Sequence, residues 1–480
     1  MKIHLGVLVS CALLAACNTT PMIVNTPAVP DQISSRYTTA INHVLNNIEA
    51  SRGLSFVRDV SITMISRELF SQNNNRELDQ SLSSDLDARL STEYAQLGFL
   101  RDTGSGLKSY YVDNLNQFVA AYYVPGTDSI YVIEAPYYDS LSFEYYLSHE
   151  LTHALQEQNY YAFNHFSYAS NPASAAQSDF RLAQRCVREG DASFTAMRYY
   201  AQFMLNNPAY NTSPSDNTTD KKDEFYDRLS THDYPRFLGI SSYAPYSLGG
   251  YFVSSTWDTG GWSAVASLYS SQMPASTYAI MTLQSRNPHV YNFNTIYSIL
   301  RSDNPVVLFA DDDNYGPIML LALLSEYTTV AAAKNGFGWS GDRLAYLRCK
   351  NENYGRMVWA LSFASIADAA SMYIWLDQLI SHRILHTVTP TRTSIGDTIV
   401  YNYPALLKTR LIKSGTSIWW LENLSDAMAR QIIADLAAPA ALPKQLAAPA
   451  NDLPVLTSLQ KELLTDIILR KVERISLPVP

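Results

Sequence analysis

Two histidines and a glutamate stand at the spacing of a metal-binding helix: His149, Glu150 and His153 form an HExxH sequence. Residues at i and i+4 of a helix project from one face, so both imidazoles can hold a single ion. Neutral imidazoles suit Zn²⁺, and a site with three protein ligands leaves a position for a water whose pKa falls to about 7. Glu150 would then serve as the general base rather than as a ligand. The alternative is a pair of helix histidines that only satisfy hydrogen bonds.

The flanking sequence indicates the helix that must carry these residues. No proline or glycine occurs from 142 to 158. The stretch has an apolar body formed by Tyr145, Tyr146, Leu147, Leu151, Ala154 and Leu155. Polar residues therefore interrupt a segment that is otherwise typical of a buried helix, and buried polar groups need partners. A metal would supply one, so we expect an active-site helix over 142–158 and Zn²⁺ as its cofactor.

A zinc site of this kind needs a third protein ligand, and three carboxylates are candidates. Glu189 and Asp191 lie in a second proline-free helical stretch, 183–200, with Glu189 36 residues after His153. Glu157 follows on the first helix. Residue types and spacing alone leave the choice open.

Ordered blocks along the chain resemble a family of bacterial and archaeal HExxH zinc metallopeptidases of gluzincin type, which are zincins. The matching blocks are Arg52-Gly53-Leu54-x-Phe56, a hairpin at 120–133, HELTHALQEQ at 149–158, Arg188-Glu189-Gly190-Asp191-Ala192, Pro245-Tyr246-x-x-Gly249-x-x-Phe252-Val253, Gly260-Gly261-Trp262, Pro274-x-Ser276-Thr277 and Gly338-Trp339-Ser340-Gly341-Asp342-Arg343. Together they span about 35 to 425. Metzincins are excluded, because Gln156 and Asn159 stand where that class has Gly and His.

The resemblance implies a zincin-like fold, peptidase chemistry and Glu189 as the third zinc ligand. Asp191 and Glu157 remain its rivals, and Asp191 is also a candidate to orient a ligand histidine through its other ring nitrogen. The chain departs from the family within Tyr278–Pro288, which lacks a usual histidine, and at Ser340, where glycine is usual. These departures concern the substrate side rather than the ligands.

Hydrolysis also requires a donor to the oxyanion of the tetrahedral intermediate. Suitable donor side chains occur at four positions C-terminal to Glu189: Arg198, His232, Tyr246 and Tyr251. Spacing does not decide between them. Tyr246 is our first choice because it lies in a matching block, and a tyrosine that only packs in the core is the alternative.

Two short β-rich runs, Phe118–Val124 and Ile130–Ile133, flank the turn sequence Pro-Gly-Thr-Asp-Ser and predict a hairpin just before the metal helix. In zincin proteases an edge strand above the site pairs with extended substrate, and one of these strands is placed in sequence to do so. An ordinary sheet hairpin is the alternative.

The remaining pattern predicts an α+β fold, a zincin-like metallopeptidase domain over 32–436 with a mostly helical second half. The expected helices are 32–49, 67–97, 262–269, 294–302, 317–333 and 368–380, and the expected strands are 57–66, 343–346, 356–363, 398–403 and 416–421. Residues 206–222 are polar without periodicity and predict a loop. Residues 437–480 are expected to form an Ala/Pro linker and then a C-terminal amphipathic helix over 455–474. This helix would dock on the domain or on a partner.

The first residues indicate export. The start of the chain resembles a bacterial lipoprotein signal, with a positive charge at Lys2, an apolar core from Leu5 to Leu14 and the ending Leu-Ala-Ala-Cys17. The resemblance implies a signal peptide over 1–16 and a fatty-acylated (palmitate-bearing) Cys17. Asn18 favours the outer membrane, facing the periplasm or the cell surface, and 17–31 is expected to be a flexible tether. An ordinary signal peptide with a chance cysteine is the alternative.

Composition limits the partners. A net charge of −9 and a pI near 5.5 argue against nucleic acid. Two cysteines remain beyond the signal, Cys186 and Cys349, as a disulfide or as two buried thiols. We therefore expect a cell-envelope zinc metallopeptidase that acts on a peptide or protein substrate. The alternatives are a catalytically silent lipoprotein of zincin fold that binds or assembles envelope components, and a zinc hydrolase of a non-peptide amide.

Overall fold

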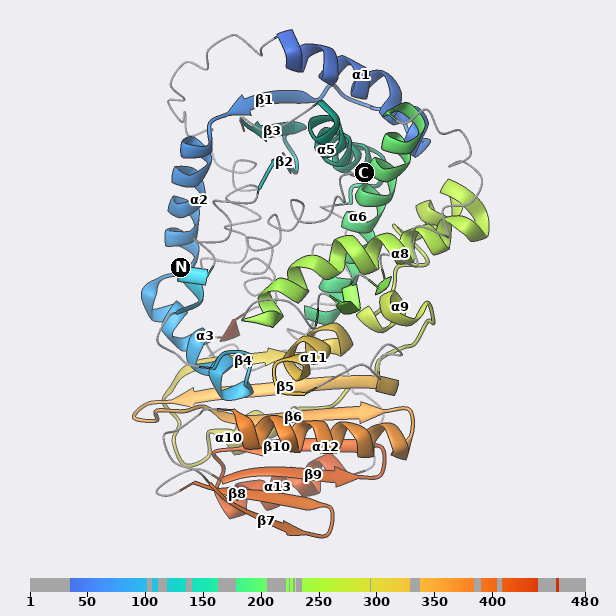
Figure 1. Cartoon of the computed structure of the whole chain (residues 1–480). Coiled ribbons are helices and arrows are strands. Elements are labelled where there is room, and N and C mark those ends of the chain that lie inside the picture. Colours follow the sequence, from blue (N-terminus) through green and yellow to red (C-terminus); the bar gives the residue numbers. More distant parts are fainter. Residues whose placement is uncertain are drawn as a thin grey trace.

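The computed structural model combines helices and strands in two parts joined by a long helix (Figure 1). The residues it describes are 35–101, 106–110, 119–134, 140–162, 178–204, 222–223, 225–227, 229, 235–293, 295–328, 337–383, 390–403, 408–438 and 455–456. Among these residues, no helix has both the length and the apolar character that crossing a bilayer requires.

The N-terminal part is a small sheet with helices packed around it. Its elements are α1 (Ser35–Arg52), β1 (Ser61–Ile65), α2 (Arg67–Ser81), α3 (Ser84–Leu97), β2 (Ala121–Val124), β3 (Ser129–Ile133), α5 (Ser140–Tyr160) and α6 (Ser178–Tyr199), which continues into the π-helical turn η3 (Tyr200–Met204). The strand order is β1-β3-β2, with β1 parallel and β2 antiparallel to β3. The predicted hairpin is confirmed, and β2 is the edge strand beside α5.

Local sequence explains where these elements begin and end. The side chains of Ser66 and Ser83 accept hydrogen bonds from backbone N–H groups in the first turns of α2 and α3, which caps both helices. Gly53, with φ +71°, ends α1 in a left-handed conformation. The predicted helix over 67–97 is therefore two helices separated by a serine cap.

The long helix α8 (Arg236–Ser267) crosses between the two parts and packs on α6 (Figure 1). Glycines allow the backbones to touch: a Cβ on Gly190 would lie 2.2 Å from the carbonyl carbon of Gly249, and one on Gly249 would lie 2.2 Å from the Cys186 oxygen. Near its end α8 is kinked at Gly260 and Gly261, which have non-helical dihedrals. The predicted helix over 262–269 is the segment after this kink.

The C-terminal part is organised around an eight-stranded sheet with the order β11-β4-β5-β6-β10-β9-β8-β7. Its elements are α9 (Thr277–Thr282), α10 (Ile296–Leu300), β4 (Val307–Asp313), α11 (Gly316–Ser325), β5 (Trp339–Cys349), β6 (Arg356–Phe363), α12 (Ile366–His382), β7 (Thr391–Ile395), β8 (Thr398–Asn402), β9 (Lys408–Ser414), β10 (Ser417–Glu422), α13 (Asp426–Ala437) and β11 (Val455–Leu456). Alternate residues of β5 and β6 join two separate cores, one with α11 and α12 and the other with α10 and α13. Helices therefore cover both faces.

The expectation of a mostly helical second half is wrong, since seven strands lie between Val307 and Glu422. Strand β4 was missed because it ends in three aspartates, which are rare in buried strands. Here each of the three is buried, and Asp312 lies in a bidentate ion pair with Arg343 at 2.7 and 2.9 Å. An ion pair offsets the free energy that burying a carboxylate costs, and the residue types of the strand alone do not reveal that partner.

Several predictions concern residues outside those described: the signal sequence, Cys17 and the tether to 31, most of the loop at 206–222, and His232. Of the predicted C-terminal helix only Val455 and Leu456 are described, and they form a strand parallel to β4, so the helix does not begin at Val455. Cys186 and Cys349 are both buried and free, so the disulfide alternative is wrong.

Candidate metal centre

Helix α5 presents both histidines of the HExxH sequence on one face, as predicted. It runs from Ser140 to Tyr160 without a helix breaker, and the side chains of His149 and His153 are 3% and 7% exposed. The apolar residues of α5 pack with α1 and the β2–β3 hairpin. The helix is therefore buried on the side of the sheet while its histidines turn toward α6.

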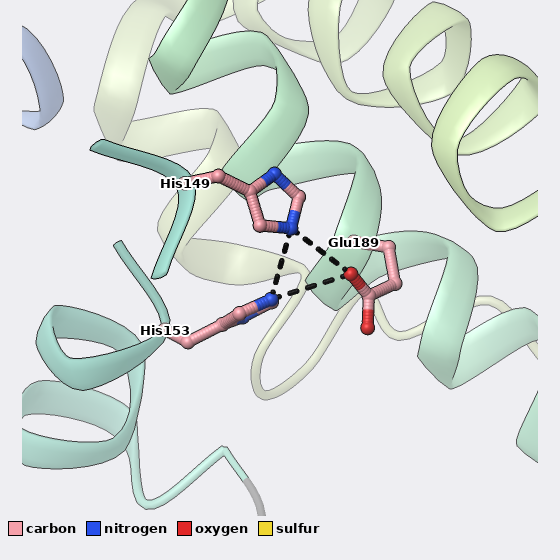
Figure 2. Close-up of side chains that lie close together, drawn as sticks. All are labelled: His149, His153 and Glu189. Atoms are coloured by element: carbon pink, nitrogen blue, oxygen red, sulfur yellow. Dashed lines mark hydrogen bonds and ion pairs between the residues drawn. The ribbon is translucent and has the colours of Figure 1, made fainter. Parts of the chain in front are cut away.

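Glu189, on α6, completes the cluster (Figure 2). Its Oε2 lies 3.2 Å from His149 Nε2 and 3.3 Å from His153 Nε2, and the two imidazole nitrogens are 3.1 Å apart. Ligand atoms bound tetrahedrally at the usual Zn–N and Zn–O distances of 2.0–2.1 Å are separated by about 3.3 Å. The three atoms thus already form a triangle of the size that one zinc ion requires.

The donor set also suits zinc chemically. Two imidazole nitrogens and one carboxylate oxygen are typical zinc ligands, whereas Mg²⁺ and Ca²⁺ prefer oxygen alone. Within the described part of the chain, the ligand atoms of His149, His153 and Glu189 all lie within 4.8 Å of one another, close enough to hold one metal ion. The rivals of Glu189 do not share this position: Asp191 is bound to Arg52, and Glu157 is outside the group.

Electrostatics within the cluster favour positive charge. Burial raises the pKa of Glu189, but His153 and the hydrogen bonds from both imidazoles outweigh it and hold that pKa well below its usual range. Burial lowers the pKa of His153, but Glu189 and Glu150 outweigh it and raise that pKa. The carboxylate is therefore charged and stabilises a cation placed between the three side chains.

Glu150 is held by the edge strand. The backbone N–H of Tyr123 in β2 donates to Glu150 Oε2 at 2.7 Å. Tyr123 pairs with Ile130 of β3 in register but directs this N–H to the opposite side, toward α5. Glu150, the predicted general base, is thus 5% exposed and lies close enough to His153 to raise the pKa of that imidazole. It is held by a strand whose outer edge faces the same helix.

Gln156 links the cluster to a buried ion pair. His153 Nδ1 lies 2.9 Å from Gln156 Oε1, and the amide of Gln156 donates to the Arg188 carbonyl at 2.9 Å and to Asp191 Oδ2 at 3.1 Å. Asp191, predicted as a residue that could orient a ligand histidine through its other ring nitrogen, therefore reaches His153 through Gln156 and not by a contact of its own. Asp191 acts one residue further away, because Gln156 lies between.

Among the described oxyanion candidates, Tyr246 is in ring contact with a ligand histidine of the cluster. Its ring centroid is 5.7 Å from that of His149, at 32°. Arg198 instead packs over Trp257 at 4.5 Å, and Tyr251 lies under the ammonium group of Lys222 at 5.1 Å. The structure thus brings Tyr246 to the ligand histidine and gives the other two described candidates aromatic or cationic neighbours elsewhere.

Reasoning from the sequence gave no role at the site to four residues of this region: Arg52, Gln156, Tyr269 and Tyr123. Arg52 was quoted in an early block but had no role, and nothing in its neighbours signals a partner 139 positions away. Tyr269 donates to Asp191 from the end of α8, at 2.7 Å. Tyr123 acts through its backbone, which no side-chain pattern can indicate.

Comparisons with protein-family models, curated proteins and solved structures found no match to this chain.

Proposed function

We propose that the chain is a zinc-dependent metallopeptidase of zincin-like fold, with His149, His153 and Glu189 as the metal ligands and Glu150 as the general base. The observation that carries this proposal is the triangle of ligand atoms, 3.1–3.3 Å on each side, with Glu150 next to the first histidine. Two imidazole nitrogens and one carboxylate oxygen at these separations match the ligand set and the ligand spacing of a zinc site with three protein ligands. A zinc ion bound there would acidify water and polarise a carbonyl oxygen.

The chain's own groups account for the other requirements of amide hydrolysis. Glu150 takes the proton of the attacking water and delivers it to the nitrogen of the leaving amine, so one carboxylate serves both steps. The Tyr123 N–H donates to Glu150 and keeps its carboxylate turned toward the histidine face of α5. The hydroxyl of Tyr246, on the ring beside His149, is our choice as donor to the oxyanion.

The edge of β2 supports a peptide as substrate. Ala121 and Tyr123 share the side of the strand that faces away from β3, because peptide groups alternate between the two edges. The Tyr123 N–H is taken by Glu150, so an extended peptide would pair with the outward backbone groups of Ala121 and pass beside Glu150. This pairing places a scissile carbonyl close to the cluster, which a small amide would not require.

Hydrolysis of a diverse peptide library by the purified full-length protein tests the proposal, with products identified by mass spectrometry. Glu150→Gln keeps the shape of the side chain and its hydrogen-bond acceptor but removes the base, so we expect cleavage to fall by about 10²- to 10⁴-fold. Glu134→Gln changes an exposed glutamate at the end of β3 and should leave cleavage unchanged. Zinc-loaded wild-type protein that cleaves no peptide would favour the silent binding protein or a non-peptide amide substrate.

Export and lipid attachment at Cys17 are part of the same proposal and depend on the sequence alone. Cell fractionation tests them. The wild-type protein should remain with membranes, and Cys17→Ser should release it; equal membrane association of both forms would contradict the lipid anchor.

A further inference from the structure

Sequence blocks that are far apart meet in one buried network behind His153. Arg52 comes from the end of α1, Gln156 from α5, Asp191 from α6, and Trp262 from α8 beyond its kink. The guanidinium of Arg52 lies over the Trp262 ring, 4.3 Å from its centroid. The proposed metal chemistry uses none of these side chains, so their arrangement calls for a different role.

The Arg52–Asp191 ion pair is the fixed point of this network. Arg52 Nε lies 2.8 Å from Asp191 Oδ1, and Nη2 donates to Oδ2 at 3.0 Å, with both side chains 0% exposed. Tyr269 donates its hydroxyl to the same Oδ2 at 2.7 Å. Burial lowers the pKa of Arg52, but Asp191 outweighs it and the pKa is raised. Both carboxylate oxygens of Asp191 therefore face donor groups, and the side chain serves as an acceptor in this network.

This acceptor determines the orientation of the Gln156 amide. Its two N–H bonds point to the Asp191 carboxylate and the Arg188 carbonyl, neither of which can donate. The amide oxygen must consequently face His153 Nδ1, at 2.9 Å. An oxygen there can only accept, so Nδ1 of His153 carries a proton. In the neutral imidazole that binds a metal, the lone pair then belongs to Nε2, which faces the cluster.

We propose that Gln156 is a positioning residue that holds His153 in its metal-binding tautomer, and that the buried Arg52–Asp191 pair sets the orientation of its amide. This inference depends on the proposed zinc site. It goes beyond that site by assigning a function to the Arg52, Asp191 and Gln156 blocks of the sequence. Without the acceptor on Nδ1, the neutral imidazole divides between two tautomers and its ring is free to turn.

The chain provides a matched control for this proposal on the same helix. Gln158 is also buried, and its amide makes four hydrogen bonds: it accepts from the N–H groups of Val57 and Arg58 and donates to the Arg58 carbonyl and Asp128. None of these partners is a metal ligand. Gln158→Met therefore removes four hydrogen bonds, against three in Gln156→Met, while leaving His153 untouched.

The test is the zinc dissociation constant of the full-length protein, measured by competition with a chromogenic chelator, for wild type, Gln156→Met and Gln158→Met. We expect Gln156→Met to weaken zinc binding by about 10- to 100-fold and Gln158→Met to leave it unchanged. Thermal unfolding of both variants without zinc measures their structural cost. The visible spectrum of the Co²⁺-loaded protein should change in Gln156→Met only, since it reports ligand geometry.

Equal zinc affinity of the two variants would overturn the positioning role while leaving the zinc site intact. Equal losses in both would also overturn it, because they would follow from general destabilisation. A folded wild-type protein that binds no zinc would overturn the proposed function together with this inference. Arg52→Lys gives a further check: it keeps the charge, loses the two-pronged contact with Asp191 and should weaken zinc binding less than Gln156→Met.

Discussion

In the proposed mechanism Tyr246 is held beside the cluster by its ring and acts through its hydroxyl. The ring lies against His149, so a phenylalanine would keep this packing. For Tyr246→Phe we expect kcat to fall by about 10²- to 10³-fold with little change in KM or zinc content, because only the donor to the oxyanion is lost. Steady-state kinetics on a cleaved peptide measure this.

The control for that substitution is Tyr251→Phe, five residues further along α8, where the ring lies near Lys222. It should retain full kcat. A large loss in Tyr251→Phe together with normal activity in Tyr246→Phe would move the oxyanion role to Tyr251.

The two histidines of the cluster were predictable because their spacing and type follow directly from helix geometry and zinc chemistry. His149 and His153 share a helix face at i and i+4, and Glu189 was selected by resemblance. The supporting residues were less accessible. The role of Gln156 depends on a carboxylate from another helix, and that of Tyr123 on a backbone N–H, so both require the tertiary arrangement.

At the scale of the helices, contact between α6 and α8 positions Glu189 relative to Tyr246. Gly249 touches the Cys186 carbonyl of α6, and a Cβ there would lie 2.2 Å from that oxygen. Gly249→Ala must separate the two helices, and we expect a loss of about 1–3 kcal/mol in the free energy of unfolding. Chemical denaturation measures this loss.

The next residue provides the comparison. A Cβ on Gly250 meets no atom within 4 Å, so Gly250→Ala should be neutral or stabilise the helix by up to about 1 kcal/mol. Equal effects of the two substitutions would contradict the account of this helix contact.

A second prediction at this scale concerns pH and the first turn of α6, where Asp179 is fully buried. Burial raises the pKa of Asp179 to about 7, although the N–H and hydroxyl of Thr277 donate to it and partly oppose the shift. The folded state thus holds a proton that the unfolded chain releases near its ordinary pKa. This stabilisation is complete below about pH 4 and is lost as the pH rises through 7.

Asp179→Asn removes that titration while retaining an oxygen to accept from Thr277. We expect the melting temperature of the wild type to fall relative to the variant by several degrees between pH 5 and pH 8.5, measured by calorimetry. Asp59→Asn, at an exposed position, should follow the wild type at every pH. A constant difference between wild type and Asp179→Asn across this range would contradict the assignment.

Across the whole molecule, the prediction of mixed α and β structure is confirmed, and errors concentrate where tertiary contacts override composition. The strands β6, β8 and β10 follow alternating or continuous apolar runs and were placed to within one residue. In strand β4 the buried Asp312 is paired with Arg343, and the length of α8 depends on packing that tolerates Pro245 and five glycines inside it. Such compensation by partners distant in sequence is absent from local patterns.

The later sequence blocks have structural roles in this arrangement. Asp342 accepts from the N–H groups of Tyr315 and Gly316 at the start of α11 and from the indoles of Trp339 and Trp359. Thr277 bonds Asp179 of α6. These contacts join the C-terminal sheet to the helix that carries Glu189, so packing in the second part of the molecule helps to position one residue of the candidate metal centre.

The central claim is that His149, His153 and Glu189 bind zinc, and elemental analysis of the purified full-length protein tests it most directly. We predict one zinc ion per chain in the wild type and in His382→Ala, which changes an exposed histidine on α12. Zinc should be lost in His153→Ala and in Glu189→Ala, with folding monitored by circular dichroism. A folded wild type without zinc, or zinc retained in both ligand variants, would contradict the account.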